Sequence, residues 1–241
     1  MIKQKTWLVT LVILAVLIVD QAVKFWIKTN MYIGEEFYIL NQSWARIHFI
    51  ENPGMAFGME FGGTFGKLAL SLFRIVAVAF LSYYLVKLVK SKAKNGLLVC
   101  FALILAGAIG NIIDSAFYGM LFSKSTPMNL AEFMPEGGGY APFLKGWVVD
   151  MFYFPLYEGN WPEWMGGGRL EFFKPVFNVA DASITVGVVA ILLFQRSFFA
   201  STSPGDQAIK DAELQRKTAE QDADVAYIEN ADNTEPKEPT V

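Results

Sequence analysis

Long apolar segments separated by polar loops dominate the pattern along this chain. A transmembrane helix needs about 20 mostly apolar residues, and four segments qualify: residues 7–27, 65–88, 97–118 and 177–199. The first is expected to be a span rather than a cleavable signal peptide, because its apolar run is too long and no small-residue cleavage site follows. The pattern therefore predicts an all-α membrane bundle of four transmembrane helices within residues 1–199.

The two longer loops, residues 28–64 and 119–176, carry a different pattern. The first contains EEFYILNQSWARIHFIENPGMAFGMEF, which mixes aromatic and β-branched residues with a turn at Asn52, Pro53 and Gly54. This composition is typical of two or three short strands. The second loop is rich in aromatic residues, glycine and proline, which suits a membrane–water interface. Together the loops predict a small β-rich extracytoplasmic subdomain.

The orientation of the spans follows from the basic residues beside them. Lys3 and Lys5 precede the first span, a lysine-rich link at residues 87–94 joins the second and third, and Arg196 ends the fourth. Short cytoplasmic flanks are enriched in Lys and Arg, so both termini are expected in the cytoplasm. The polar, acidic segment 200–241 is expected to be a disordered cytoplasmic tail.

Composition narrows the class of protein further. Of the 241 residues, 54% are hydrophobic and only 18% are charged, against about 25% charged in soluble domains. This excludes a disordered chain and a coiled coil, and the net charge of −3 leaves no field for binding nucleic acid. The single Cys100 excludes a disulfide scaffold, and the single His48 excludes a multi-histidine zinc site. No metal or cofactor is expected.

Polar residues within or beside the spans are the candidates for chemistry, because each buried charge costs about 2.5–3.5 kcal/mol at a helix centre. With both termini cytoplasmic, these residues fall at one depth near the outer leaflet surface, which suggests a site. The candidates are Asp20, Lys24, Asn111, Asp114, Asp150, Asn178 and Asp181.

Structural roles are the alternative for several of these residues. Asp20 and Lys24 have the spacing of a helical ion pair, whereas Asn178 and Asp181 are placed to cap the fourth helix. Asp150 is harder to explain in this way, since its apolar neighbours would raise its pKa. Two carboxylates with separated pKa values can act as general base and general acid in peptide hydrolysis.

A set of sequence blocks places most of these residues in a known order. The blocks are DQAVK (20–24), ENPGMAF (51–57), GAIGNIID (107–114), VVDMF (148–152) and FNVADASITVG (177–187). As a set they make the chain resemble the lipoprotein signal peptidases, or signal peptidase II, which are bacterial membrane aspartyl proteases. The resemblance implies that Asp150 and Asp181 are the catalytic dyad. It also implies that other residues bind substrate or support the site: Asp20, Lys24, Asn52, Gly54, Asn111, Asp114 and Asn178.

The same resemblance implies the substrate and the setting. The substrate would be a prolipoprotein whose cysteine carries diacylglycerol, cut on the N-terminal side of that cysteine, and globomycin-type inhibitors would bind. We expect a monomer in the bacterial cytoplasmic (inner) membrane, in contact with lipids. Residues 50–61 and the second outer loop, with Trp147, Phe152 and Phe154, are expected to cover the dyad.

Departures from the family concern substrate contacts rather than the dyad. Ser115 stands where the family usually has Arg, and Met151 where Phe is common. The loop segments 121–146 and 159–171 are longer than expected, and the acidic tail is extra.

Two other classes of function are open at this stage. A transporter would spread its intramembrane carboxylates through the membrane depth, and an assembly factor would use the aromatic loops for docking. The inner halves of the spans are almost free of charge, which favours a surface-level site over a transporter. An assembly factor would not need Asp150 and Asp181 together.

Overall fold

A computed structural model describes residues 2–53, 63–155, 157–160, 162–172, 176–199 and 212–221. The chain divides into two compact units, Met1–Phe194 and Gln195–Val241. The candidate site belongs to the first unit, which carries the helices and strands described next.

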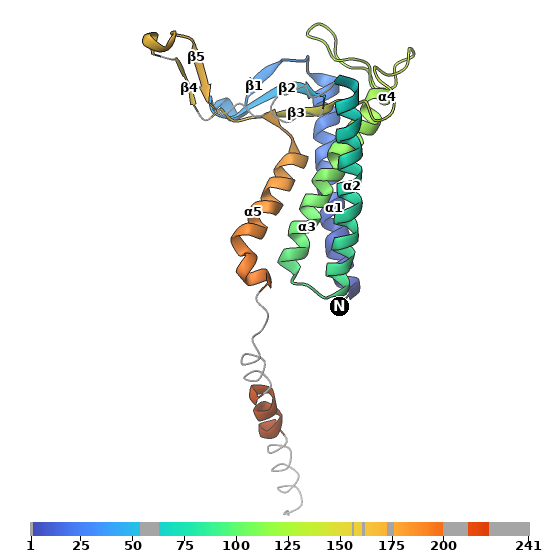
Figure 1. Ribbon diagram of the computed structural model, residues 1–241, viewed down its shortest axis with the longest axis vertical. Coiled ribbons are helices and arrows are strands. Elements are labelled where there is room, and N and C mark those ends of the chain that lie inside the picture. The colour runs from blue at the N-terminus through green and yellow to red at the C-terminus, as the bar shows by residue number, and fades with distance from the viewer. Residues whose placement is uncertain are drawn as a thin grey trace, which may run out of the picture. The chain divides into compact units, whose positions relative to one another are not determined.

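Four long helices within the described residues confirm the predicted membrane bundle (Figure 1). They are α1 (Ile2–Asn30), α2 (Gly63–Lys90), α3 (Asn95–Ile113) and α5 (Val179–Phe199). The third span runs beyond α3 through a π-helical turn, η2 (Asp114–Tyr118), into α4 (Gly119–Leu121). A π turn within an α-helix is rare and often marks a functional site.

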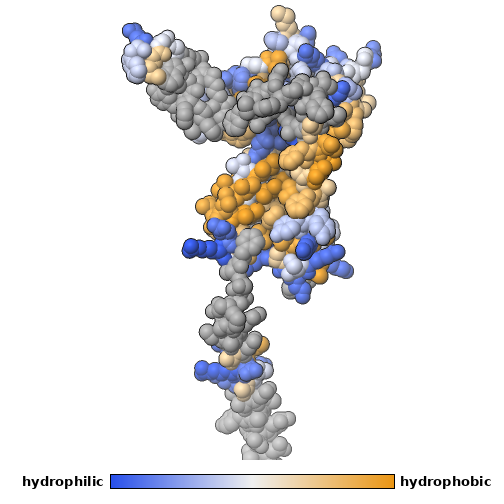
Figure 2. Space-filling model, viewed as in Figure 1, coloured by the Kyte–Doolittle hydropathy of each residue, from blue (hydrophilic) through white to orange (hydrophobic). Residues whose placement is uncertain are grey.

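The helices expose apolar side chains and bury charged ones, as expected of spans in lipid. Figure 2 shows an apolar band over the helices, and Trp7, Leu11 and Ile18 of α1 are 65–75% exposed. On the same helix, Asp20 and Lys24 are fully buried. A span keeps such charges only where other groups compensate them inside the protein.

A small antiparallel sheet confirms the predicted β subdomain. Its strands follow the order β1-β2-β3-β6, with β1 at Glu36–Tyr38, β2 at Arg46–Asn52, β3 at Val148–Tyr153 and β6 at Val176–Phe177. Strands β4 (Tyr157–Asn160) and β5 (Arg169–Phe172) pair separately. Short 3-10 turns follow β1 (η1, Ile39–Asn41) and β4 (η3, Glu163–Met165).

Side chains on the two faces of β3 have different roles: one face packs into an apolar cluster, and the other carries Asp150. Val149 and Met151 are fully buried in an apolar cluster with Phe49 of β2 and Ile27 of α1. Successive residues of a strand point to opposite faces, so Asp150 projects from the other face. This cluster fixes the strand against the end of α1.

Strand pairing also brings the start of α5 beside β3. Phe152 pairs with Phe177, the last residue of β6, and α5 begins at Val179, two residues later. Segments far apart in the sequence, β3 and the N-terminus of α5, are therefore neighbours.

Glycines allow α3 and α5 to approach closely. A Cβ atom at Gly107 of α3 would overlap the carbonyl oxygen of Ala180, and one at Gly187 of α5 would lie 2.7 Å from the carbonyl oxygen of Cys100. Contacts this close require residues without side chains. The block GAIGNIID therefore provides a packing surface as well as polar residues.

In the second unit, residues 212–221 form a helix, where the sequence interpretation expected no regular structure. Residues with high helix propensity, such as Glu213 and Lys217, favour it locally. Arg216 and Glu220, four residues apart, add an ion pair of 3.1 Å. The rest of the tail lies outside the described residues.

Candidate active site

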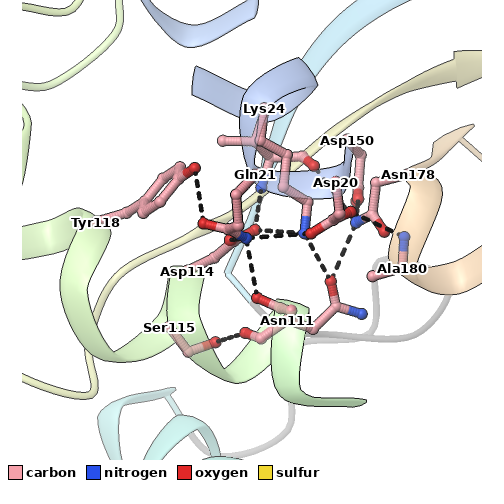
Figure 3. Close-up of polar contacts among 12 residues, drawn as sticks. Asp20, Gln21, Lys24, Asn111, Asp114, Ser115, Tyr118, Asp150, Asn178 and Ala180 are labelled. Atoms are coloured by element: carbon pink, nitrogen blue, oxygen red, sulfur yellow. Dashed lines mark hydrogen bonds and ion pairs between the residues drawn. The ribbon is translucent and has the colours of Figure 1, made fainter. Parts of the chain in front are cut away.

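A buried ion cluster joins the first and third spans. Lys24 Nζ of α1 lies 2.9 Å from Asp20 Oδ2 and 2.8 Å from Asp114 Oδ2, and all three side chains are fully buried (Figure 3). The helical pair expected between Asp20 and Lys24 is present, but Asp114 makes it a triad. Two carboxylates around one ammonium leave a local negative charge that needs further hydrogen-bond donors.

Side-chain and backbone groups from several elements donate hydrogen bonds to this ion cluster and its partners. Gln21 Nε2 donates to Asp114 Oδ1 at 2.9 Å, and Tyr118 donates to Gln21 Oε1 at 3.2 Å. The sequence interpretation missed both residues, although Gln21 lies within the block DQAVK and is a polar residue in an apolar span. The π turn η2 begins at Asp114 and ends at Tyr118, so these two partners of Gln21 both belong to it.

The ion cluster also holds the two elements that carry the candidate dyad. The backbone N–H of Ala180, in the first turn of α5, donates to Asp20 Oδ1 at 2.8 Å. The backbone N–H of Val149 in β3 donates to Asp114 Oδ2 at 3.3 Å. Each of these backbone groups is next in the chain to a candidate catalytic aspartate, Asp181 or Asp150. The triad therefore positions the site.

Two amide side chains link Asp150 to Asp181. Asn178 Nδ2 donates to Asp150 Oδ1 at 2.6 Å and to Asn111 Oδ1 at 3.2 Å. Asn111 Nδ2 in turn donates to Asp181 Oδ1 at 2.8 Å, and its Oδ1 accepts a hydrogen bond from Lys24 at 3.0 Å. The structure thus brings the predicted polar residues of the spans together with Asp150. Figure 3 labels all of them except Asp181.

Asn178 and Asp181 also form a helix cap, the alternative role considered from the sequence. Asn178 Oδ1 accepts a 2.9 Å hydrogen bond from the backbone N–H of Asp181, and Asp181 Oδ2 accepts one of 3.4 Å from the backbone N–H of Asn178. Such reciprocal bonds define a capping box. The cap orients both side chains, so capping and a role in the site are compatible.

Asp150 and Asp181 lie in different electrostatic surroundings. Burial, and then the negative charge of Asp181, raise the pKa of Asp150 to about 7, although hydrogen bonds from Asn178 and Asn52 and the charge of Lys24 oppose the shift. Asp150 is 2% exposed, whereas Asp181 is partly exposed. At neutral pH a large share of Asp150 therefore carries a proton.

Parts of the predicted site lie outside the described residues. Asn52 ends β2 and hydrogen-bonds Asp150, but residues 54–61, which include Gly54 and form most of the first segment of the predicted cover, are not described. Of the aromatic residues expected around Asp150, Phe152 and Phe154 pack on Phe177 with ring centroids 5.9 and 5.7 Å apart, and Trp147 packs on Tyr140 at 5.5 Å. Within the described residues, no group of three or more His, Cys, Asp or Glu side chains is arranged to hold a metal ion.

Comparisons with known proteins agree on one family. The family described as signal peptidase (SPase) II matches residues 12–198. The lipoprotein signal peptidase of Porphyromonas gingivalis is 50% identical over 189 residues, covering 77% of this chain and 81% of the relative. That of Amoebophilus asiaticus is 36% identical over 198 residues, covering 80% of each. A solved bacterial membrane enzyme is 26% identical with a TM-score of 0.51, covering 77% of this chain and 90% of the other.

Proposed function

Because the chain belongs to the signal peptidase II family, we propose that it removes the signal peptide from diacylglyceryl-modified prolipoproteins by aspartic catalysis. The chain is a protease and a multi-pass bacterial membrane protein. The proposed cut lies on the N-terminal side of the lipid-bearing cysteine. The transporter and assembly-factor interpretations are set aside, because the family is one of peptidases.

The observation that carries the proposal is the link from Asp150 through Asn178 and Asn111 to Asp181. It ties two carboxyl groups with different surroundings into one network. Burial raises the pKa of Asp150 to about 7, so we assign Asp150 as the acid and the partly exposed Asp181 as the base. Pairs whose surroundings separate their pKa values are the usual source of acid and base in one site.

The proposed reaction needs a water molecule and these two side chains. Asp181 accepts a proton from the water, whose oxygen attacks the carbonyl carbon of the scissile peptide bond. Asp150 donates its proton to the leaving amine of the cysteine as the C–N bond breaks. Transfer of the proton from Asp181 to Asp150 then restores the starting state.

Neighbouring groups hold the dyad in these roles. Asn178 and Asn111 accept and donate hydrogen bonds but do not titrate, so they orient both carboxyl groups at any working pH. Lys24 is held by Asp20 and Asp114 and contacts the network only through Asn111. It therefore supplies positive charge without protonating either catalytic carboxylate directly.

The membrane setting explains the choice of substrate. The basic flanks support a proposed orientation with both termini in the cytoplasm and the dyad near the outer leaflet surface of the cytoplasmic membrane. A substrate whose cysteine carries diacylglycerol is held by its acyl chains at that depth. Cyclic peptides of the globomycin type, which inhibit this family, are proposed to occupy the same site.

The test compares amide substitutions at the dyad with one elsewhere. Asp150→Asn and Asp181→Asn should each abolish cleavage of a synthetic diacylglyceryl-modified prolipoprotein by purified, correctly folded protein. Glu132→Gln, at an exposed carboxylate of the second outer loop, should leave cleavage unchanged. Substantial turnover by either aspartate variant would refute aspartic catalysis at this site.

A further inference from the structure

Arg74 lies on α2 beside the candidate site but takes no part in the reaction proposed above. Its Nη1 donates to Ser115 Oγ of η2 at 3.4 Å, which is at the long end of the hydrogen-bond range. Ser115 is the one hydrogen-bond acceptor of Arg74 that the described part of the chain provides. A guanidinium has five N–H donors, and the described residues use one of them.

The charges around Arg74 connect it to the dyad. The carboxylates of Asp181, Asp150 and Asp114 all act on the guanidinium, and Asp181 acts most strongly. Asp114 is already paired with Lys24, and within the described residues Arg74 has no ion-pair partner of its own. A partly buried cation in a membrane span without such a partner is costly.

Ser115 explains why the cation comes from α2. Its hydroxyl donates to the backbone carbonyl of Asn111 at 3.0 Å and accepts the hydrogen bond from Arg74. The side chain is short and 4% exposed, so it anchors the guanidinium without extending toward the dyad. The positive charge therefore reaches the region of η2 from α2.

We propose that Arg74 is a substrate-positioning residue that binds backbone carbonyl oxygens of the prolipoprotein next to the scissile bond. The inference rests on the proposed function. Uncharged acceptors fit better than a phosphate or carboxylate, because the carboxylate of Asp181 would repel an anion beside it. Peptide carbonyls are the acceptors that the substrate offers there, and the planar fork of an arginine can donate to two of them.

The binding test removes the reaction so that affinity is measured alone. In an Asp150→Asn background, Arg74→Gln should weaken binding of a diacylglyceryl-modified lipobox peptide about 10- to 100-fold, the range for losing a hydrogen bond to a charged group. Arg74→Lys should give a smaller loss, since the charge stays but the fork is lost. Lys87→Gln, at the opposite end of the same helix, is the matched control and should bind normally.

The kinetic test separates positioning from a structural role. With the dyad intact, Arg74→Gln should raise KM by a similar factor and leave the pH dependence of kcat unchanged. Adding Ser115→Arg to Arg74→Gln should restore at least half of the lost affinity by returning the charge from η2. A merely structural role for Arg74 predicts no such rescue.

Unchanged peptide affinity in folded Arg74→Gln or Arg74→Lys protein would overturn the proposal, as would failure of Ser115→Arg to restore any affinity. A fall in kcat with unchanged affinity would also overturn it, because Arg74 would then act on the dyad. Failure of the proposed function looks different: the unmodified enzyme would not cleave the peptide, or Asp150→Asn would retain activity.

Discussion

Asn178 donates a 2.6 Å hydrogen bond to Asp150 while its own Oδ1 caps the helix that carries Asp181. One side chain therefore sets the position of both candidate catalytic groups. Its Nδ2 also reaches Asn111 and the backbone carbonyl of Val149. This sharing makes the dyad sensitive to a residue that does not itself titrate.

Asn178→Ala should change the pH dependence of cleavage. The hydrogen bond from Asn178 lowers the pKa of Asp150, so its loss should raise that pKa and keep the acid protonated to higher pH. The alkaline limb of the kcat profile should therefore move upward, and loss of the cap should cost about 1 kcal/mol of stability. Rate measurements between pH 5 and 9 check this, with exposed Asn129→Ala as control; an unmoved alkaline limb would contradict it.

Asp150 should make the protein less stable as the pH rises. Its pKa is about 7 in the folded protein against 3.8 for an ordinary aspartate, so the folded state binds more protons, and stability is lost between these values as pH increases. At 1.36 kcal/mol per pKa unit the penalty at pH 8 is on the order of 2–4 kcal/mol.

Asp150→Asn should remove this penalty, because an amide does not ionise. Thermal unfolding in detergent should show variant and unmodified protein melting together at a pH below 3.8, with the variant more stable at pH 8. A difference in melting temperature that is independent of pH would contradict the prediction. The gain would come with loss of activity, as is common for strained active sites.

Removing the ammonium of Lys24 should disrupt the fold. Lys24→Met leaves Asp20 and Asp114 buried without their ion pairs, which should cost about 3–5 kcal/mol. Adding Asp20→Asn and Asp114→Asn should recover much of the stability, since no buried charge then lacks a partner. Melting temperature and the yield of folded protein are the measurements, with exposed Lys90→Met as control. Equal losses in the single and triple variants would argue against the ion cluster.

Separating α3 from α5 should impair both stability and cleavage. A Cβ atom at Gly107 would overlap the backbone of Ala180, so Gly107→Val should cost about 1–3 kcal/mol through overpacking and shift the start of α5. Gly137→Ala is the control, because a Cβ atom there meets nothing within 4 Å. Normal cleavage by Gly107→Val would show that the close approach is not required for the site.

The spans and the main site residues could be predicted because their signals are local. A long apolar run predicts a helix, and Asp20, Asn111, Asp114 and Asn178 stand out as polar residues within or beside such runs. The contacts among them depend on how the helices rotate and on strand register, which single-chain patterns do not contain. The linking role of Asn178 follows from the pairing of β6 with β3, more than 20 residues apart in the sequence.

The contact made by Arg74 could not be predicted from the sequence either. From sequence alone, an arginine within an apolar run is expected to snorkel toward the membrane surface or to pair across helices. Its contact with Ser115 depends on the rotation of α2 against the third span. Similarly, Gln21 and Tyr118 gain their roles from the π turn, which no residue pattern in the block predicts.

The attachment of α5 to the ion cluster has a consequence for biosynthesis. Asp20 and Asp114 emerge from the ribosome early, whereas Asn178, Ala180 and Asp181 enter with the last span. Under the proposed mechanism, a nascent chain carries only one of the two catalytic carboxyl groups until α5 has been made and its first turn has bonded to Asp20. We therefore expect copies that end before α5 to lack peptidase activity.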